Sequence, residues 1–223
     1  MLNHAQTRLL TQGARCLGLE LSDEHLARFS LYLEETARWS RATSLISQTD
    51  PAVIIRKHIL DSLAIAPLIP ADARLLDLGS GAGFPGLVLA ILQPSRQVAL
   101  IEARRKRVSF LKETARRIKV VNVQVYEGRA EVLAKEDSLR NCFAVVITRA
   151  TWSLKEFLLL ASPFVTDGGI AVAMKGPQSK KELIDLGASL QTVDFRLKKI
   201  HEYTLPFGEE SRQAITFAKR CST

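Results

Sequence analysis

The stretch "LLDLGSGAGFPG", residues 75 to 86, decides the fold of this chain. A short apolar run ends just after Asp77, and the chain then passes into a turn with glycines at positions 79, 81, 83 and 86. An apolar strand followed at once by a glycine-rich turn is typical of the first strand-to-helix connection in an open α/β sheet. Ligands bind such sheets at this connection. The stretch therefore predicts both a fold class and the place of a site.

The sequence after Arg74 alternates between short apolar runs and longer amphipathic stretches. The predicted strands are residues 74–78, 97–101, 121–126, 143–148 and 169–175, and the predicted helices are residues 85–93, 104–119, 153–162 and 179–190. This alternation predicts a doubly wound, Rossmann-like α/β domain over residues 71–223. Two further strand-like segments, "FRLKKIHEYTLP" and "RQAITFAKR", have no helix between them and predict an antiparallel hairpin that closes the sheet.

Residues 1–70 contain helix signals only. Ser22 and Asp23 are good N-cap residues before a segment with apolar side chains at helical spacing, and Asp50 followed by Pro51 predicts another helix start. We therefore expect an N-terminal helical extension in front of the α/β domain.

The charge of the chain favours a polyanionic partner. With 31 Lys and Arg against 23 Asp and Glu, the 223 residues have a formal net charge of +8. Nucleic acid is the first partner to consider, although a basic protein without such a partner stays open, because net charge does not determine binding. The sequence gives no sign of an obligate protein partner.

Three features of the sequence indicate where in the cell the protein is expected. They are its cysteines, its N-terminus and the length of its apolar runs. The cysteines stand far apart, so their spacing predicts neither a metal site nor a disulfide framework. No apolar run approaches the roughly 18 residues that cross a bilayer, and no signal peptide is evident. We expect a soluble, cytoplasmic protein that does not insert in a membrane.

The glycine turn lacks the features of the two commonest phosphate-binding loops. No lysine follows Gly86, as a nucleoside triphosphate loop would need. The third glycine of a dinucleotide loop, counted from Gly79 and Gly81, would fall where the chain has Phe84. Asp77 would lie at the open mouth of the first strand, where it would repel a pyrophosphate but attract a cation. S-adenosylmethionine is cationic and free of phosphate, so it fits this pattern.

A second acid supports a nucleoside ligand. Glu102 ends the next predicted strand, "VALIE", where a carboxylate can accept hydrogen bonds from both ribose hydroxyls. After the third strand, Ala130 can pack on an adenine ring and Glu131 can accept from its amine. Glu131 can equally be an ordinary acid in the first turn of a helix.

The predicted fourth strand should end beside the reacting methyl group. Cys142 precedes that strand, so it lies at the wrong end to act as a nucleophile on cytosine C5. Residues 148–150 are Thr, Arg and Ala, which do not form the N-P-P-Y type motif common in amine methylation. A ring nitrogen with a free lone pair needs no base, only orientation. No catalytic side chain is therefore predicted.

Several cations are candidates for substrate contact. Arg149 can bind an acceptor on the base or the cofactor carboxylate, and Lys175 can meet a phosphate, although either can be a structural or surface residue. Lys57 and His58 form a second candidate contact from the helical extension, but His58 can also be an ordinary hydrogen-bonded histidine. Eight Lys or Arg among the sixteen residues 104–119 can contact phosphate in part or can be solvated.

In these motifs the chain resembles the bacterial small-subunit ribosomal RNA guanine-N7 methyltransferase family, also called glucose-inhibited division protein B. The resemblance runs along nearly the whole chain. It is carried by "KHILDS" at 57–62, "DLGSGAGFPG" at 77–86, "KRVSFL" at 106–111, "RAE" at 129–131, "TRA" at 148–150 and "MKG" at 174–176. The arginine-rich start of the helix after the second strand and the sequence of the last strand depart mildly from the family pattern.

The resemblance implies methyl transfer from S-adenosylmethionine to N7 of guanine 527 in 16S ribosomal RNA. It places the cofactor contacts on Gly79, Phe84, Glu102, Ala103, Arg104, Ala130, Glu131 and Arg149. The substrate can be naked RNA, the 30S subunit or a precursor of that subunit. A nicotinamide-dependent oxidoreductase and a non-enzymatic RNA-binding protein are the competing interpretations, and Phe84 with Asp77 argues against the first.

Overall fold

The structure is a computed structural model that describes residues 2–43, 45–150, 152–177, 179–187 and 193–221. One seven-stranded sheet has the order β3-β2-β1-β4-β5-β7-β6. Its strands are β1 (Leu75–Leu78), β2 (Val98–Glu102), β3 (Val123–Glu127), β4 (Phe143–Thr148), β5 (Val165–Lys175), β6 (Phe195–Thr204) and β7 (Ser211–Lys219). The strand order reverses between β1 and β4, which is where ligands bind in doubly wound sheets.

The first five strands are parallel, as predicted, and β7 runs antiparallel to both β5 and β6. The predicted C-terminal hairpin is thus confirmed, with β7 inserted beside β5. The strand predictions are correct to within a few residues; β5 is longer than predicted because it begins at Val165 and pairs Val165 with Phe143 before its register shifts.

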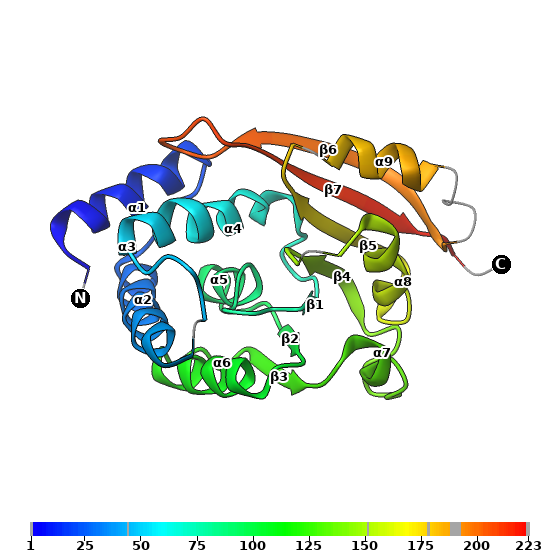
Figure 1. The fold of residues 1–223 in the computed structure, drawn as a ribbon, viewed down its shortest axis with the longest axis horizontal. Helices are drawn as coiled ribbons and strands as arrows, with labels where there is room; N and C mark the ends of the chain where they lie inside the picture. Colours follow the sequence, from blue (N-terminus) through cyan, green and yellow to red (C-terminus); the bar gives the residue numbers. More distant parts are fainter. Residues whose placement is uncertain (1, 44, 151, 178, 188–192, 222–223) are drawn as a thin grey trace.

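Helices cover both faces of the sheet (Figure 1). The helices that follow β1 to β5 are α5 (Gly86–Leu92), α6 (Arg105–Arg117), α7 (Ala130–Leu133), α8 (Leu154–Ala161) and α9 (Ser179–Gly187). The predicted helices agree except at their ends; residues 188–190 of the last prediction lie outside the described residues, and α7 was not predicted as an element.

Alternate residues of the strands face opposite cores, as the two-residue period of a strand requires. Leu75 and Leu100 belong to the core shared with α5, α6 and the N-terminal helices. Leu76 and Ile101 belong to the second core, with Phe157 of α8. The inner strands are therefore buried on both faces, whereas the edge strands β3 and β6 are partly exposed.

In the described residues 2–43 and 45–70, all of the regular secondary structure is helical. They are α1 (His4–Cys16), α2 (Asp23–Thr43), α3 (Pro51–Ile54), a π-helical turn η1 (Ile55–Ile59), α4 (Leu60–Ala64) and a 3-10 turn η2 (Ala66–Leu68). The predicted caps are confirmed: Ser22 Oγ accepts from the His25 amide at 3.3 Å, and Asp50 Oδ1 accepts from the Ala52 amide at 2.9 Å with Pro51 at the first helical position.

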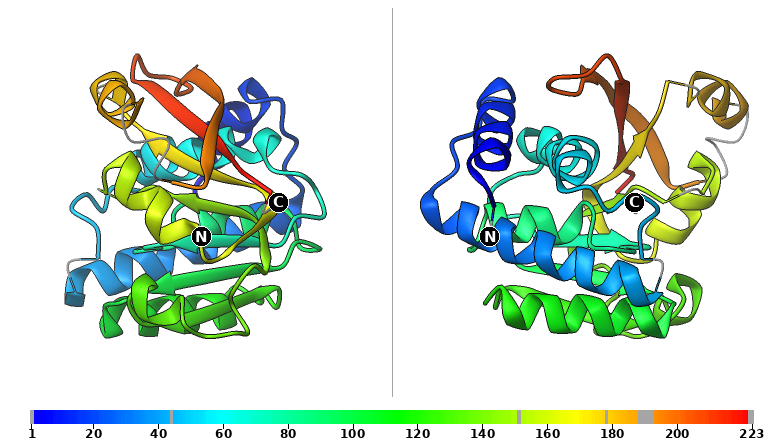
Figure 2. Two further views of the ribbon diagram at one scale, coloured as in Figure 1. Left: turned by 90° about the vertical axis from the view of Figure 1, so that its right-hand side faces the viewer. Right: turned by 60° about the vertical axis from the view of Figure 1, so that its left-hand side comes forward.

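The helical extension packs onto the α/β domain. In Figure 2, α2 runs alongside α6, and the buried Glu35 of α2 forms an ion pair with Arg117 of α6 at 2.9 Å. Leu10, Phe29 and Leu63 lie in the same core as Leu75 and Leu100 of the sheet. The extension is thus part of the wall around the sheet, and α4 leads directly toward β1.

Candidate cofactor and substrate site

The glycine loop between β1 and α5 has a shape that side chains would strain. Gly79, Gly81 and Gly83 have φ angles of 68°, 57° and 89°, in the left-handed region that glycine adopts most readily. The hydroxyl of Tyr32, on α2, donates to the carbonyl of Ala82 at 2.5 Å. The N-terminal extension therefore fixes the loop from outside.

Asp77 lies behind this loop and not at its open mouth. The carboxyl is fully buried, its Oδ2 accepts from the Gly86 amide at 2.9 Å, and Oδ1 has no partner. Burial raises the pKa of Asp77 to about 7, against the opposing effect of the Gly86 amide. The expected open position of this carboxylate differs from the one observed, because the strand end points the side chain under α5.

Glu102 occupies the position expected at the end of β2. Its Oε2 accepts from the Gly81 amide at 2.9 Å, and its Oε1 accepts from the Arg104 amide at 2.8 Å. The side chain therefore ties the glycine loop to the start of α6 and is only 5% exposed. Each carboxylate oxygen has a second acceptor site, so both can still accept from a ligand hydroxyl.

A cavity of about 380 Å³ opens beside Glu102 at the carboxyl ends of β1, β2 and β3. Its described lining is Gly79, Ile101, Glu102, Ala103, Arg104, Arg107, Gly128, Arg129, Ala130, Glu131, Ala150 and Trp152. A Cβ at Gly79 would lie 3.0 Å from Cη2 of the Trp152 indole, so the bare backbone lets the indole close over the loop. We call this space the first cavity.

The first cavity has arginines as well as acids in its wall. Arg104, Arg107 and Arg129 line it together with Glu102 and Glu131. Nη1 of Arg107 lies 3.9 Å from Oε2 of Glu102. The carboxylate of Glu102 therefore lies at the loop, with the arginines around it.

A second cavity, of about 390 Å³, lies at the ends of β4 and β5. Its described lining is Lys57, His58, Asp61, Arg149, Met174, Lys175, Gly176 and Arg212. Lys57 and His58 come from the π-helical turn η1, a wider turn of the kind often found at functional sites. All four residues predicted to bind substrate, Lys57, His58, Arg149 and Lys175, therefore meet in one cavity.

Arg149 lines the second cavity and contacts two of its other lining residues, His58 and Asp61. Its guanidinium carbon is 5.1 Å from the centroid of the Phe84 ring, and the imidazole of His58 stacks on the same ring at 4.9 Å. Nη2 of Arg149 lies 2.9 Å from Nδ1 of His58. Phe84 itself is 5% exposed and underlies this pair, away from the described lining of the first cavity.

The acid that balances these cations is Asp61. Its Oδ2 lies 3.3 Å from Nη1 of Arg149, and its Oδ1 accepts from the Tyr203 hydroxyl at 2.8 Å and lies 3.9 Å from Nε of Arg212. Burial, together with the negative charge of Asp61 and the hydrogen bond to it, raises the pKa of Tyr203 well above its ordinary value. The helical extension and the C-terminal hairpin are thereby joined at one carboxylate.

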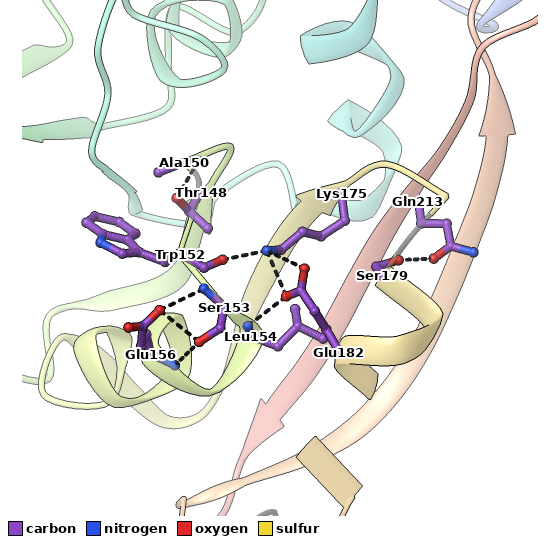
Figure 3. A network of polar contacts seen from close by, with 10 residues as sticks. All are labelled: Thr148, Ala150, Trp152, Ser153, Leu154, Glu156, Lys175, Ser179, Glu182 and Gln213. Carbon is purple, nitrogen blue, oxygen red and sulfur yellow. Dashed lines mark hydrogen bonds and ion pairs between the residues drawn. The ribbon is translucent and has the colours of Figure 1, made fainter. Parts of the chain in front are cut away.

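Lys175 has partners within the chain (Figure 3). Its ammonium donates to the carbonyl of Trp152 and lies 2.9 Å from Oε2 of Glu182, and only 10% of the side chain is exposed. Of the two alternatives for Lys175, a surface lysine is wrong, because the side chain is largely buried. Its expected contact with phosphate stays a prediction, although the ammonium already has these two acceptors.

The basic run on α6 contains arginines paired with acids of the chain, two of them exposed, and exposed cations next to the first cavity lining in sequence. Arg107, Arg116 and Arg117 pair with Glu102, Glu113 and Glu35. Arg105 and Lys106 are exposed, between Arg104 and Arg107, which line the first cavity. Contact of these exposed groups with RNA stays a prediction.

Within the described residues, no cluster of three or more His, Cys, Asp or Glu side chains could hold a metal ion. Nor, over the same part of the chain, is any helix both long and apolar enough to cross a bilayer.

Comparison with known proteins decides the family. The family model described as "rRNA small subunit methyltransferase G" matches residues 25–214. The chain belongs to this family. A family relative, ribosomal RNA small subunit methyltransferase G of Desulfitobacterium hafniense, is 36% identical over 207 residues, which are 93% of this chain and 86% of the relative. The corresponding protein of Geobacter sulfurreducens is 33% identical over 214 residues, covering 96% and 98%.

Solved structures agree on the fold of this member of the methyltransferase G family. Aeropyrum pernix fibrillarin, solved with natively bound S-adenosyl-L-methionine, is similar with a TM-score of 0.55 at 17% identity, over 70% of this chain and 73% of that chain. Precorrin-6y C5,15-methyltransferase of Geobacter metallireducens is similar with a TM-score of 0.54 at 14% identity, over 80% and 92%. The Rossmann-like methyltransferase fold and the family resemblance, both predicted from sequence, are confirmed.

In this member of the methyltransferase G family, only some of the residues predicted to bind the cofactor line the first cavity. Gly79, Glu102, Ala103, Arg104, Ala130 and Glu131 line the first cavity. Arg149 lines the second cavity, Gly81 binds Glu102 through its amide, and Asp77 and Phe84 are buried below.

Sequence reasoning missed Arg107, Arg129 and Trp152 in the first cavity and Arg212 in the second. Arg107 and Arg129 lie within quoted motifs, "KRVSFL" and "RAE", that could have suggested them; Arg212 comes from the hairpin and has no such signal.

Proposed function

We propose that this protein transfers the methyl group of S-adenosylmethionine to N7 of guanine 527 in 16S ribosomal RNA, in the cytoplasm, where ribosomes assemble. One observation carries the proposal. Two adjacent residues after β4 line different cavities: Ala150 lines the cavity with the nucleoside-compatible carboxylate, and Arg149 lines the cavity with four cations. Family membership supports the RNA substrate.

The first cavity fits the cofactor in size and in chemistry. A volume of about 380 Å³ falls in the usual range of small-molecule pockets, about 300 to 1,000 Å³. Glu102 would accept from the ribose hydroxyls, Ala130 would pack on the adenine, and Glu131 would accept from its amine. When bound, the cofactor supplies an electrophilic methyl group. Asp77 and Phe84 would act from beneath the cavity. Asp77 would fix the glycine loop, and Phe84 would form part of the buried floor.

The second cavity would hold the guanine and its phosphates. Arginine donates only, so Nδ1 of His58 accepts from Arg149 and the neutral ring carries its proton on Nε2. That N–H and Arg149 can donate to acceptors on the guanine edge, and Lys57, Lys175 and Arg212 lie where phosphate charge would be stabilised. Guanine N7 carries a free lone pair, so orientation of the base is the task of these residues.

Residues 1–70 would act in this scheme as a helical extension of a methyltransferase domain, residues 71–223. The extension supplies Lys57 and His58 to the substrate cavity and Tyr32 to the cofactor loop. No obligate protein partner is proposed.

The deciding experiment incubates the protein with labelled S-adenosylmethionine and 16S RNA in three forms: naked RNA, a 30S precursor and the mature 30S subunit. We expect label at N7 of guanine 527 in at least one form, mapped by cleavage at the modified base. Label at another base would refute the assigned target. RNA binding without transfer of label to any form would favour a non-enzymatic RNA-binding protein.

A further inference from the structure

Lys175, Glu182 and the segment Trp152–Leu154 form one polar network between the two cavities (Figure 3). Lys175 ends β5 and lines the second cavity, while its ammonium donates to the carbonyl of Trp152. The indole of Trp152 lines the first cavity. A single ammonium therefore touches the backbone of a residue that forms part of the cofactor wall.

Glu182, in the first turn of α9, connects to this network twice. Its Oε2 lies 2.9 Å from the Lys175 ammonium and accepts from the Leu154 amide at 3.0 Å, and Oε1 lies 3.3 Å from the same ammonium. Leu154 is the first residue of α8. The Glu182 carboxylate thus holds two groups. One is the Lys175 ammonium, which donates to the Trp152 carbonyl, and the other is the backbone amide of Leu154.

The rest of the segment is equally constrained. Ser153 and Glu156 form a capping box, in which the Ser153 amide donates to Glu156 at 2.9 Å and the Glu156 amide donates to Ser153 at 3.2 Å. Trp152 therefore enters a fixed helix start, and its indole packs against the glycine loop at Gly79. The position of the Trp152 indole then depends on the contacts that hold the Trp152 backbone. These are the hydrogen bond from Lys175 and, through Lys175, the ion pair with Glu182.

We infer that Glu182 is a positioning residue for cofactor binding, which holds Lys175 and the Leu154 amide and through them the Trp152 wall of the first cavity. This inference rests on the proposed function, because it takes the first cavity as the cofactor site. It assigns Glu182 no contact with the cofactor: the carboxylate acts through the two groups it binds.

The first test measures the Kd of S-adenosylhomocysteine by calorimetry for the parent protein and for Glu182→Ala. We expect Kd to rise about tenfold, within the usual range of coupling between linked sites. Asp185→Asn is the matched control, an exposed acid on the same helix, and should leave Kd unchanged. Glu182→Gln keeps an acceptor for Leu154 but loses the charge, so its Kd should lie between; it also serves if the alanine variant does not fold.

The second test separates positioning from general loss of stability. In a Trp39→Phe background, Trp152 is the remaining tryptophan of the chain, and Glu182→Ala should shift its emission to longer wavelength without ligand. The double variant with Lys175→Met should raise Kd no more than the larger single change, because both act on one network. In Glu182→Ala alone, methylation should show a raised KM for the cofactor with kcat close to that of the parent.

The outcomes keep the two proposals apart. A parent protein that does not bind S-adenosylhomocysteine overturns the proposed function. A parent that binds it, with equal Kd and unchanged Trp152 emission in folded Glu182→Ala and Glu182→Gln, overturns this inference alone. A lower melting temperature with an unchanged Kd would likewise show a merely structural role.

Discussion

Nδ1 of His58 accepts a hydrogen bond from Nη2 of Arg149 at 2.9 Å while both side chains lie on the ring of Phe84. Burial, and then the positive charges of Arg149, Lys57 and Arg212, lower the pKa of His58 to about 4. The imidazole is therefore neutral at neutral pH, and the positive charge of the pair resides on Arg149. A histidine in this state can accept and donate hydrogen bonds but does not add a charge for the RNA.

The His58 environment predicts a pH dependence of stability. The folded-state pKa lies below the usual value of about 6.5, so the unfolded chain binds the proton more readily. The contribution of the neutral His58 to the free energy of unfolding is therefore complete above pH 6.5. It decreases by about 1 to 3 kcal/mol as the pH falls from 6.5 toward 4. In His58→Asn, whose amide oxygen can replace Nδ1, the free energy of unfolding should fall less over this interval. Parallel curves from urea titrations of both proteins would contradict the assignment.

Local sequence patterns were enough to place the sheet and most of the first cavity. The alternation of apolar runs and amphipathic stretches locates the parallel strands, and strand ends then bring Gly79, Glu102 and Ala130 together by topology alone. That argument needs only the order of elements, which is a local property of the chain.

The parts that were missed depend on contacts between distant segments. Asp61 meets Tyr203 and Arg212 only after the hairpin has folded back over the N-terminal helices. For Lys175 the sequence leaves open contact with a phosphate or a place at the surface, and nothing near it in the sequence indicates the acceptors at Trp152 and Glu182. Likewise the direction of the Asp77 side chain depends on the packing of α5.

Gly86 is predicted to tolerate no side chain. A Cβ there would lie 2.5 Å from Leu100 Cδ2 and 2.7 Å from Oδ2 of Asp77, all within the buried core. Gly86→Ala should lower the free energy of unfolding by about 1 to 3 kcal/mol, as overpacking of a core does. Gly187→Ala is the control, since nothing lies within 4 Å of a Cβ at that position. Equal urea midpoints for the two variants would show that the loop adjusts freely.

Asp77 should make stability depend on pH in the opposite sense to His58. Its folded-state pKa, about 7, lies above the usual 3.8 because the carboxyl is buried. The stabilising effect of the protonated form is present below pH 4 and is lost as the pH rises to 7. Relative to the parent, Asp77→Asn should therefore gain about 2 to 4 kcal/mol in free energy of unfolding between these limits. The measurement is chemical unfolding at several pH values, and a constant difference would count against the buried carboxyl.

The same position predicts an indirect effect of Asp77 on the cofactor. Asparagine can still accept from the Gly86 amide, whereas alanine leaves that buried amide without its acceptor. The Kd of S-adenosylhomocysteine should rise more in Asp77→Ala than in Asp77→Asn. If both variants lose affinity equally, the charge itself, and not the loop geometry, is what the cofactor requires.

Arg149 is predicted to serve the RNA more than the cofactor. It lines the second cavity and contacts Asp61, His58 and the Lys57 carbonyl through two nitrogens, a geometry that lysine does not reproduce. Arg149→Lys should lower kcat/KM for the RNA about 100-fold, corresponding to about 3 kcal/mol. The Kd of S-adenosylhomocysteine should change less than about threefold, which is about 0.7 kcal/mol. Matching losses for both ligands would return Arg149 to the cofactor contacts.

Glu102 should be the residue on which cofactor affinity depends most. Its two carboxylate oxygens bind the amides of Gly81 and Arg104, so removal of the side chain releases the glycine loop from α6 as well as removing the acceptor for the ribose. Hydrogen bonds to a charged group are worth about 1.5 to 3 kcal/mol each, and Glu102→Ala should raise the Kd of S-adenosylhomocysteine about 100-fold. Glu102→Gln keeps one acceptor oxygen and should raise it about tenfold. Glu127 provides the control. It is an exposed acid on β3, opposite Glu102 in the strand register, and Glu127→Ala should bind S-adenosylhomocysteine with the Kd of the parent. Calorimetry on the three variants decides the assignment, because a Glu102→Ala protein that binds as tightly as Glu127→Ala has its cofactor site elsewhere.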